Sequence, residues 1–118
     1  AIRDGLDQLA RHPIDVVLMD LQYAPAVLTP AKIDAAERMV ALIADCAAEA
    51  KVNVFRRFLL MRQWHEVERF SFDQLIDPTD VDRLHQSDWS ARRLAYALAD
   101  LITHAPKSAA PAASTPPV

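Results

Sequence analysis

The chain has little of what marks a disulfide-rich, membrane-spanning or nucleic-acid-binding protein. Its single cysteine, Cys46, excludes an internal disulfide and a metal site built from cysteines. The longest purely apolar run, residues 39–44, is far shorter than the ~20 residues of a membrane-spanning helix. Acidic residues outnumber basic ones by 16 to 13, so no basic excess indicates a nucleic acid or an anionic membrane surface as a partner.

Glycine is also scarce, because Gly5 is the only one, and the sequence starts with Ala1 rather than methionine. A complete α/β domain uses several glycines in its turns. We therefore expect an incomplete or processed chain. The rest of the composition is that of a folded protein: 118 residues, 52% of them hydrophobic and 25% charged, are enough for one domain and not for two.

The two parts of the chain differ sharply in composition. Residues 105–118 hold four prolines, five alanines, three small hydroxyl residues and one lysine. Such a segment cannot pack a core and favours extended, solvated conformations. We predict a disordered tail over 105–118 and a folded domain over 2–104.

Hydrophobic patterning predicts a strand, a long helix and a second strand. Residues 16–19 form an apolar run led by β-branched valines, which suits a strand buried on both faces. Residues 31–51 carry an apolar stripe at helical spacing, with Thr29 as a candidate cap. This order is that of a βαβ unit with a parallel sheet. The other predicted elements are helices over 2–11 and 57–69, strands over 14–19 and 52–55, an irregular segment over 71–84, and a helix over 88–104 capped by Ser87 or Asp88.

One short pattern could carry chemistry. Asp82 and His85 lie three residues apart, just before the last predicted helix. A serine nucleophile needs a base to take its proton, and that base needs a carboxylate to fix its tautomer and balance its charge. On spacing alone, the pair can equally be two polar loop residues near a helix cap.

The surrounding residues give the pattern a family context. Residues 82–90, Asp-Arg-Leu-His-Gln-Ser-Asp-Trp-Ser, followed by an alanine- and leucine-rich helix, resemble the last conserved block of SGNH/GDSL hydrolases. Residues 16–25 are similar to the strand and the Gly-x-Asn-Asp block of that family. The resemblance covers residues 2–104, the C-terminal half of a family domain. It implies an α/β fold, part of a three-layer α/β/α (flavodoxin-like) sandwich with a short parallel sheet.

The resemblance also implies residue roles. His85 would be the general base, Asp82 would orient it, and Gln22 would donate a hydrogen bond to the oxyanion, standing where the family has asparagine. The family's Gly-Asp-Ser motif is missing, so the nucleophile would lie before Ala1 or on another chain, and the 118 residues alone should not hydrolyse an ester. Further candidates, for contacts with the substrate, are Asp20, Tyr23, Arg57 and Trp89.

These observations together predict a serine esterase or acyl esterase of the SGNH/GDSL type, acting on a small-molecule ester, with no cofactor and no metal. The expected partner is the missing N-terminal half or a second copy of the chain. Family members are often exported, which predicts a periplasmic or secreted protein. The alternative from another class is a non-catalytic α/β or helical interaction module, in which the loop of His85 only caps the last helix. The sequence leaves the substrate and the oligomeric state open.

Overall fold

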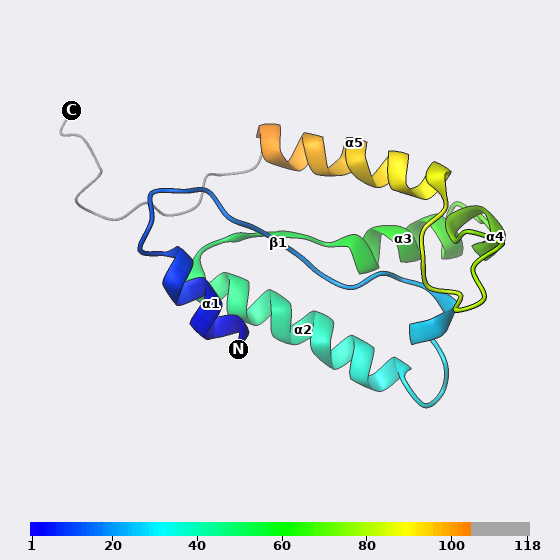
Figure 1. The fold of residues 1–118 in the computed structure, drawn as a ribbon, viewed down its shortest axis with the longest axis horizontal. Coiled ribbons are helices and arrows are strands. Elements are labelled where there is room, and N and C mark those ends of the chain that lie inside the picture. The colour runs from blue at the N-terminus through cyan, green and yellow to red at the C-terminus, as the bar shows by residue number, and fades with distance from the viewer. Residues whose placement is uncertain (105–118) are drawn as a thin grey trace.

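The computed structural model describes residues 1–104, and the tail predicted for 105–118 lies outside the described residues (Figure 1). The described part is a mixed α/β fold, as predicted. Its elements in chain order are α1 (Ile2–Leu9), β1 (Val17–Met19), the 3-10 turn η1 (Pro25–Val27), α2 (Ile33–Ala50), β2 (Asn53–Phe55), α3 (Arg57–Glu66), α4 (Phe72–Leu75) and α5 (Asp88–His104).

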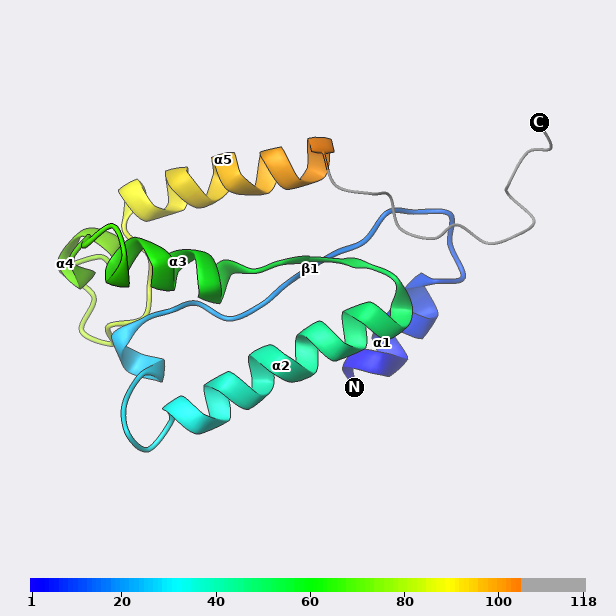
Figure 2. The ribbon, with the colours of Figure 1, turned by 180° about the vertical axis from the view of Figure 1, so that it is seen from behind.

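The sheet confirms the predicted strand, helix, strand unit. β1 and β2 pair in parallel, with Val17 opposite Asn53 and Met19 opposite Phe55, and α2 connects them. Both strands therefore end on the same side of the molecule. In both views the strands run between α1 and α2 on one side and α5 on the other (Figures 1 and 2). Each strand covers only three residues, so β1 is shorter than the segment 14–19 predicted for it.

The long helix α2 differs from the prediction at its start. It begins at Ile33, and the Thr29 side chain makes no cap. Instead, the carbonyl oxygen of Thr29 accepts the N–H groups of Lys32 and Ile33, both at 2.9 Å. The helix ends at Ala50. Its C-cap, Lys51, has a left-handed φ of 57°, and the Val52 N–H then returns to the Ala47 carbonyl at 3.0 Å. The predicted cap at Thr29 is therefore wrong, because backbone groups already satisfy the first N–H groups.

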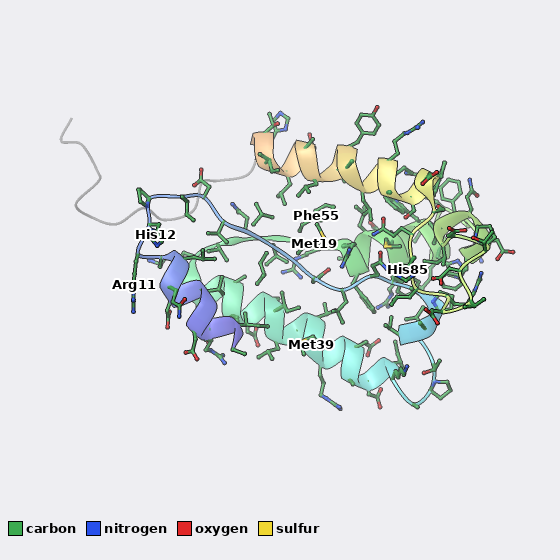
Figure 3. All side chains as sticks on the ribbon, in the orientation of Figure 1. Arg11, His12, Met19, Met39, Phe55 and His85 are labelled. Carbon is green, nitrogen blue, oxygen red and sulfur yellow. The ribbon has the colours of Figure 1, made fainter. Side chains whose placement is uncertain are left out.

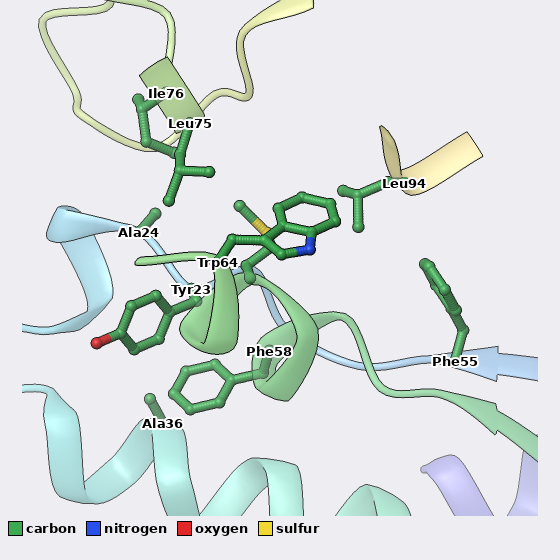
Figure 4. Close-up of a cluster of buried hydrophobic side chains, with 10 residues drawn as sticks. Tyr23, Ala24, Ala36, Phe55, Phe58, Trp64, Leu75, Ile76 and Leu94 are labelled. Carbon is green, nitrogen blue, oxygen red and sulfur yellow. The ribbon is translucent and has the colours of Figure 1, made fainter. Parts of the chain in front are cut away.

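The hydrophobic core surrounds α3. Phe58, Met61 and Trp64 lie on one face of this helix, and none is more than 4% exposed. Figure 4 shows Phe58 directed toward Ala36 of α2 and Trp64 toward Leu94 of α5. The helix α3 therefore packs against α2 on one side of the sheet and against α5 on the other. Leu75, Ile76, Tyr23, Ala24 and Phe55 complete this cluster.

The segment before α5 is more regular than predicted. Ser71 caps the short helix α4, because its hydroxyl accepts the Gln74 N–H at 3.2 Å. Ile76 and Gln86 then form an isolated antiparallel bridge that closes the loop between them. The last helix, α5, has the predicted bounds, and Ser87 caps it by accepting the Ser90 N–H at 3.1 Å. Among residues 1–104, no helix combines the length and apolar character needed to cross a bilayer.

Candidate functional site

The loop that carries His85 is organised around the carboxylate of Asp80. One of its oxygens, Oδ2, accepts the backbone N–H groups of Leu84 at 2.9 Å and of His85 at 2.7 Å. The other, Oδ1, accepts the backbone N–H of Asp82 at 3.0 Å. These bonds, the one from His85 first, hold the pKa of Asp80 well below its usual range. Asp80 is therefore an ionised hydrogen-bond acceptor at neutral pH.

The same carboxylate also binds the imidazole ring. Nδ1 of His85 lies 2.9 Å from Oδ2 of Asp80. Because an ionised carboxylate can only accept, Nδ1 must carry the proton, and Nε2 of the neutral ring then holds the lone pair. The side chain of His85 is 71% exposed, and Figure 3 places it beyond the ends of β1 and β2, on the side away from His12. This geometry suits a residue that takes a proton from a second molecule or segment.

Asp82 lies in the same loop but does not make the predicted contact. The Nδ1 bond goes to Asp80, although oxygens of both aspartates and a ring nitrogen of His85 all lie within 4.8 Å of one another. The backbone explains the difference. Arg83 has a left-handed φ of 54°, which turns the chain so that residues 84 and 85 face Asp80. Sequence reasoning missed Asp80; the signal for it was the pattern Asp-x-Asp-x-x-His.

Asp80, Asp82 and His85 are also a donor set that could hold a cation, since carboxylate oxygens and imidazole are common metal ligands. However, Oδ2 of Asp80 already accepts three N–H groups. The hydrogen bonds of the loop thus account for the position of this carboxylate without an ion.

Gln22 joins the loop after β1 to the loop of His85. Its Nε2 donates a short hydrogen bond to the carbonyl oxygen of Leu84, the residue before His85. The structure therefore brings the predicted oxyanion donor next to the predicted base. One of its two amide N–H groups is occupied by Leu84, so only the second could bind an oxyanion.

Asp20 and Arg57, two of the candidates for contacts with the substrate, hold β1 against α3. Asp20 is 2% exposed, and its Oδ1 accepts the Phe58 N–H at 2.9 Å, at the start of α3. The guanidinium of Arg57 donates to the Asp20 carbonyl at 2.8 and 3.2 Å. Burial raises the pKa of Asp20, while the bond from Phe58 opposes that shift. Both residues thus hold the strand ends against α3, and Arg57 also lines an apolar hollow next to them.

Tyr23 and Trp89, the other two substrate candidates, belong to the packing of the core. Tyr23 is 7% exposed, its ring packs edge-on to Phe58, and its hydroxyl donates to Oε1 of Glu66 at 3.0 Å. The ring of Trp89 packs against Trp64 and Phe70, with centroid distances of 6.1 and 4.7 Å. Aromatic rings after a strand or at a helix start can line a site, but here both fill space between helices.

A mostly apolar hollow of about 200 Å³ lies between the strand ends and α5. Met19 and Phe55 line it from the sheet, Leu94 and Leu98 from α5, Arg57 from α3, and Gln86, the neighbour of His85, from the loop before α5. Comparisons with known proteins add nothing to this geometry, because no family model, no curated protein and no solved structure matches the chain.

Proposed function

We propose that this chain supplies the acid–base part of a serine ester hydrolase of the SGNH/GDSL type, with His85 as the general base. The observation that carries the proposal is the hydrogen bond from Nδ1 of His85 to a carboxylate that is itself held by backbone N–H groups. That bond leaves the lone pair of Nε2 on a well-exposed ring. The fold belonging to this function is a three-layer α/β/α sandwich, of which the parallel pair of strands would be one part.

The chemistry follows from this arrangement. Nε2 of His85 takes the proton of a serine hydroxyl while the serine oxygen attacks the ester carbonyl carbon. The carbonyl oxygen becomes an oxyanion, which the second amide N–H of Gln22 can bind. When the tetrahedral species collapses, the bond to the alcohol breaks and the alcohol leaves with the proton from Nε2. Water then repeats these steps on the acyl-enzyme. The hollow beside Gln86 is suited to an apolar acyl group.

The nucleophile itself would come from outside these 118 residues. The serines in the described part of the chain are occupied in other ways. Ser71 caps α4, Ser87 caps α5 and donates to the carbonyl of Gln74, and Ser90 is fully buried. Ser108 and Ser114 lie outside the described residues, and neither stands in a Gly-Asp-Ser motif. We therefore propose that a preceding segment or a second polypeptide carries the serine.

The experiment is active-site labelling with a fluorophosphonate, which reacts with activated serines. The protein that carries this sequence is purified from its source, and its intact mass is measured with and without the probe. We expect one adduct, which His85→Ala abolishes. The matched control is His104→Ala, because His104 also has Nδ1 at 3.0 Å from an aspartate oxygen and is equally exposed, but at the far end of α5. A folded protein that takes up no probe, or a His85→Ala variant labelled like the control, would contradict the proposal.

A second candidate, a non-catalytic interaction module, rests on a different observation. The sheet has two strands among the described residues, so each strand has one edge without a strand neighbour. Met19, at the end of β1, is 41% exposed, and Leu59 of α3 is 50% exposed. Unpaired edges and exposed apolar side chains are typical of surfaces that bind another chain. Absence of probe labelling together with concentration-dependent association in sedimentation would favour this candidate.

A further inference from the structure

We propose that a groove between β2, α3 and α5 is a surface through which two copies of this chain associate about a twofold axis. The groove has a volume of about 360 Å³. Its apolar lining residues are Val54 of β2, Leu59 and Leu60 of α3, and Ala97 and Leu101 of α5. The residues that line it do not include Gln22 or His85, so the proposal is independent of the ester hydrolase.

The first argument is the composition of this surface. The Leu59 side chain is 50% exposed, and Tyr96, one helical turn before Asp100 on α5, is 73% exposed. The polar lining residues are Arg56, Gln63 and Asp100, with neither lysine nor glutamate among them. Interfaces between proteins are enriched in tyrosine and arginine and depleted of lysine and glutamate. The groove and its border therefore have the composition of a contact between two chains.

The second argument is that the charges of the groove are complementary to those of a second copy. Arg56 and Asp100 both line it and carry opposite charges. The Arg56 guanidinium forms no ion pair among residues 1–104, and Asp100 has a second carboxylate oxygen besides the one that binds His104. An acidic or a basic partner would match one of the two residues and be repelled by the other. A twofold axis that passes between them places Arg56 of one copy against Asp100 of the other, twice, so a second copy matches both.

The third argument is that the groove is formed before any partner binds. All of its lining residues lie in β2, α3 or α5, apart from Arg56, the one residue between β2 and α3. Leu60, Ala97 and Leu101 also pack against the buried cluster around Trp64, which fixes the floor of the groove. A preformed surface loses little conformational entropy on association. The free energy of its apolar contacts is therefore available for binding.

The first experiment measures the association of the full 118-residue chain by sedimentation equilibrium at micromolar to millimolar concentrations. We expect a monomer–dimer equilibrium. Leu59→Lys brings a charge against the apolar surface of the second copy and should weaken the dimer by on the order of 10–100-fold. The matched control is Val81→Lys, because Val81 is a 92% exposed aliphatic side chain outside the groove; this variant should dimerise like the unmodified chain.

The second experiment tests the charge pairing by exchange between copies. Arg56→Glu alone, or Asp100→Arg alone, places like charges opposite each other at both symmetric contacts, and each should weaken the dimer by on the order of tenfold. In an equimolar mixture of the two variants, the glutamate at position 56 of one chain faces the arginine at position 100 of the other, and the remaining contact is the original one. The mixture should therefore form a heterodimer about as tightly as the unmodified chain dimerises. A contact within one chain cannot produce this recovery, since no chain in the mixture carries both substitutions.

Three outcomes would overturn the proposal. A chain that stays monomeric at millimolar concentration would leave the groove to a different partner. A dimer that Leu59→Lys weakens no more than Val81→Lys does would use another face, such as the exposed end of β1 at Met19. Single charge variants whose mixture shows no recovery would contradict the twofold pairing. Circular dichroism of each variant checks that weaker association does not come from unfolding.

Labelling separates this inference from the proposed function. A dimer that takes up no fluorophosphonate refutes the ester hydrolase and leaves the association surface in place. A monomer that is labelled in a manner dependent on His85 refutes the association surface and leaves the hydrolase in place.

Discussion

The carboxylate of Asp20, the residue after β1, should stabilise the fold by capping α3, a helix with no side-chain cap of its own. The residue before α3, Arg56, makes no side-chain cap, and the Phe58 N–H instead donates to Oδ1 of Asp20 at 2.9 Å. Asp20→Ala leaves that N–H without its partner in a buried environment. The expected loss in the free energy of unfolding is about 1–3 kcal/mol, the cost of an unsatisfied buried donor.

Asp20→Asn separates the contribution of the hydrogen bond from Phe58 to the free energy of unfolding from that of the buried charge. The amide oxygen can accept the Phe58 N–H, so most of the capping is retained, and no charge has to be buried. Burial raises the pKa of Asp20, which means that the folded state prefers the protonated carboxyl. The contribution of Asp20 is therefore most favourable below its unfolded pKa of about 3.9 and declines as the pH rises through the folded pKa. At neutral pH, Asp20→Asn should be at least as stable as the unmodified protein, and that relative advantage should disappear in acid.

The assay is urea unfolding followed by the fluorescence of the buried Trp64, at pH 7 and at several acidic values. With a urea dependence of roughly 1–3 kcal/mol per molar, Asp20→Ala should lower the midpoint by about 1 M. Asp34→Ala is the matched control, because Asp34 is exposed in the first turn of α2; its effect should stay within about 0.5 kcal/mol. Equal destabilisation by Asp20→Asn and Asp20→Ala at pH 7 would refute the argument, since the charge rather than the hydrogen bond would then be what matters.

Three further substitutions test the local geometry by the same unfolding assay. Lys51→Gly should stabilise the protein by about 1 kcal/mol, because glycine adopts the left-handed end of α2 without strain; no gain would contradict that conformation. Ser90→Ala should also stabilise it, by about 1 kcal/mol, since the Ser90 hydroxyl is buried and has no hydrogen-bond partner among the described residues; destabilisation would reveal a hidden partner. Tyr23→Phe should cost about 0.5–1.5 kcal/mol through loss of the bond to Glu66, and Glu66→Gln should then add little.

The apolar hollow between the sheet and α5 could not be predicted from the sequence. Its lining comes from β1, β2, α3, α5 and the loop before α5, which are far apart in the sequence. Gln86, the residue after His85, is among its lining residues. Met19, which lines the hollow, is also 41% exposed at the end of β1. The hollow and the open strand edge therefore share this residue. Labelling and sedimentation decide between an acyl site and a surface for another chain.

Local signals were enough to predict most elements. The span of α5 and its cap at Ser87 agree with the structure, and so does the parallel strand pair separated by α2. Apolar periodicity and capping depend on residues that are close in the chain, which is why a single sequence contains them. The predicted cap at Thr29 failed because a backbone carbonyl can replace a hydroxyl without any change in the pattern.

The sequence by itself therefore determined the α/β class, the order of the elements and the loop in which His85 lies. Only the tertiary structure decided what the polar side chains do. Asp20, the residue after β1, caps the neighbouring helix α3, and Asp80 rather than Asp82 binds the imidazole. The physical reason is that a carboxylate binds whichever N–H group lies nearest in space, and one left-handed residue, Arg83, is enough to change which group that is.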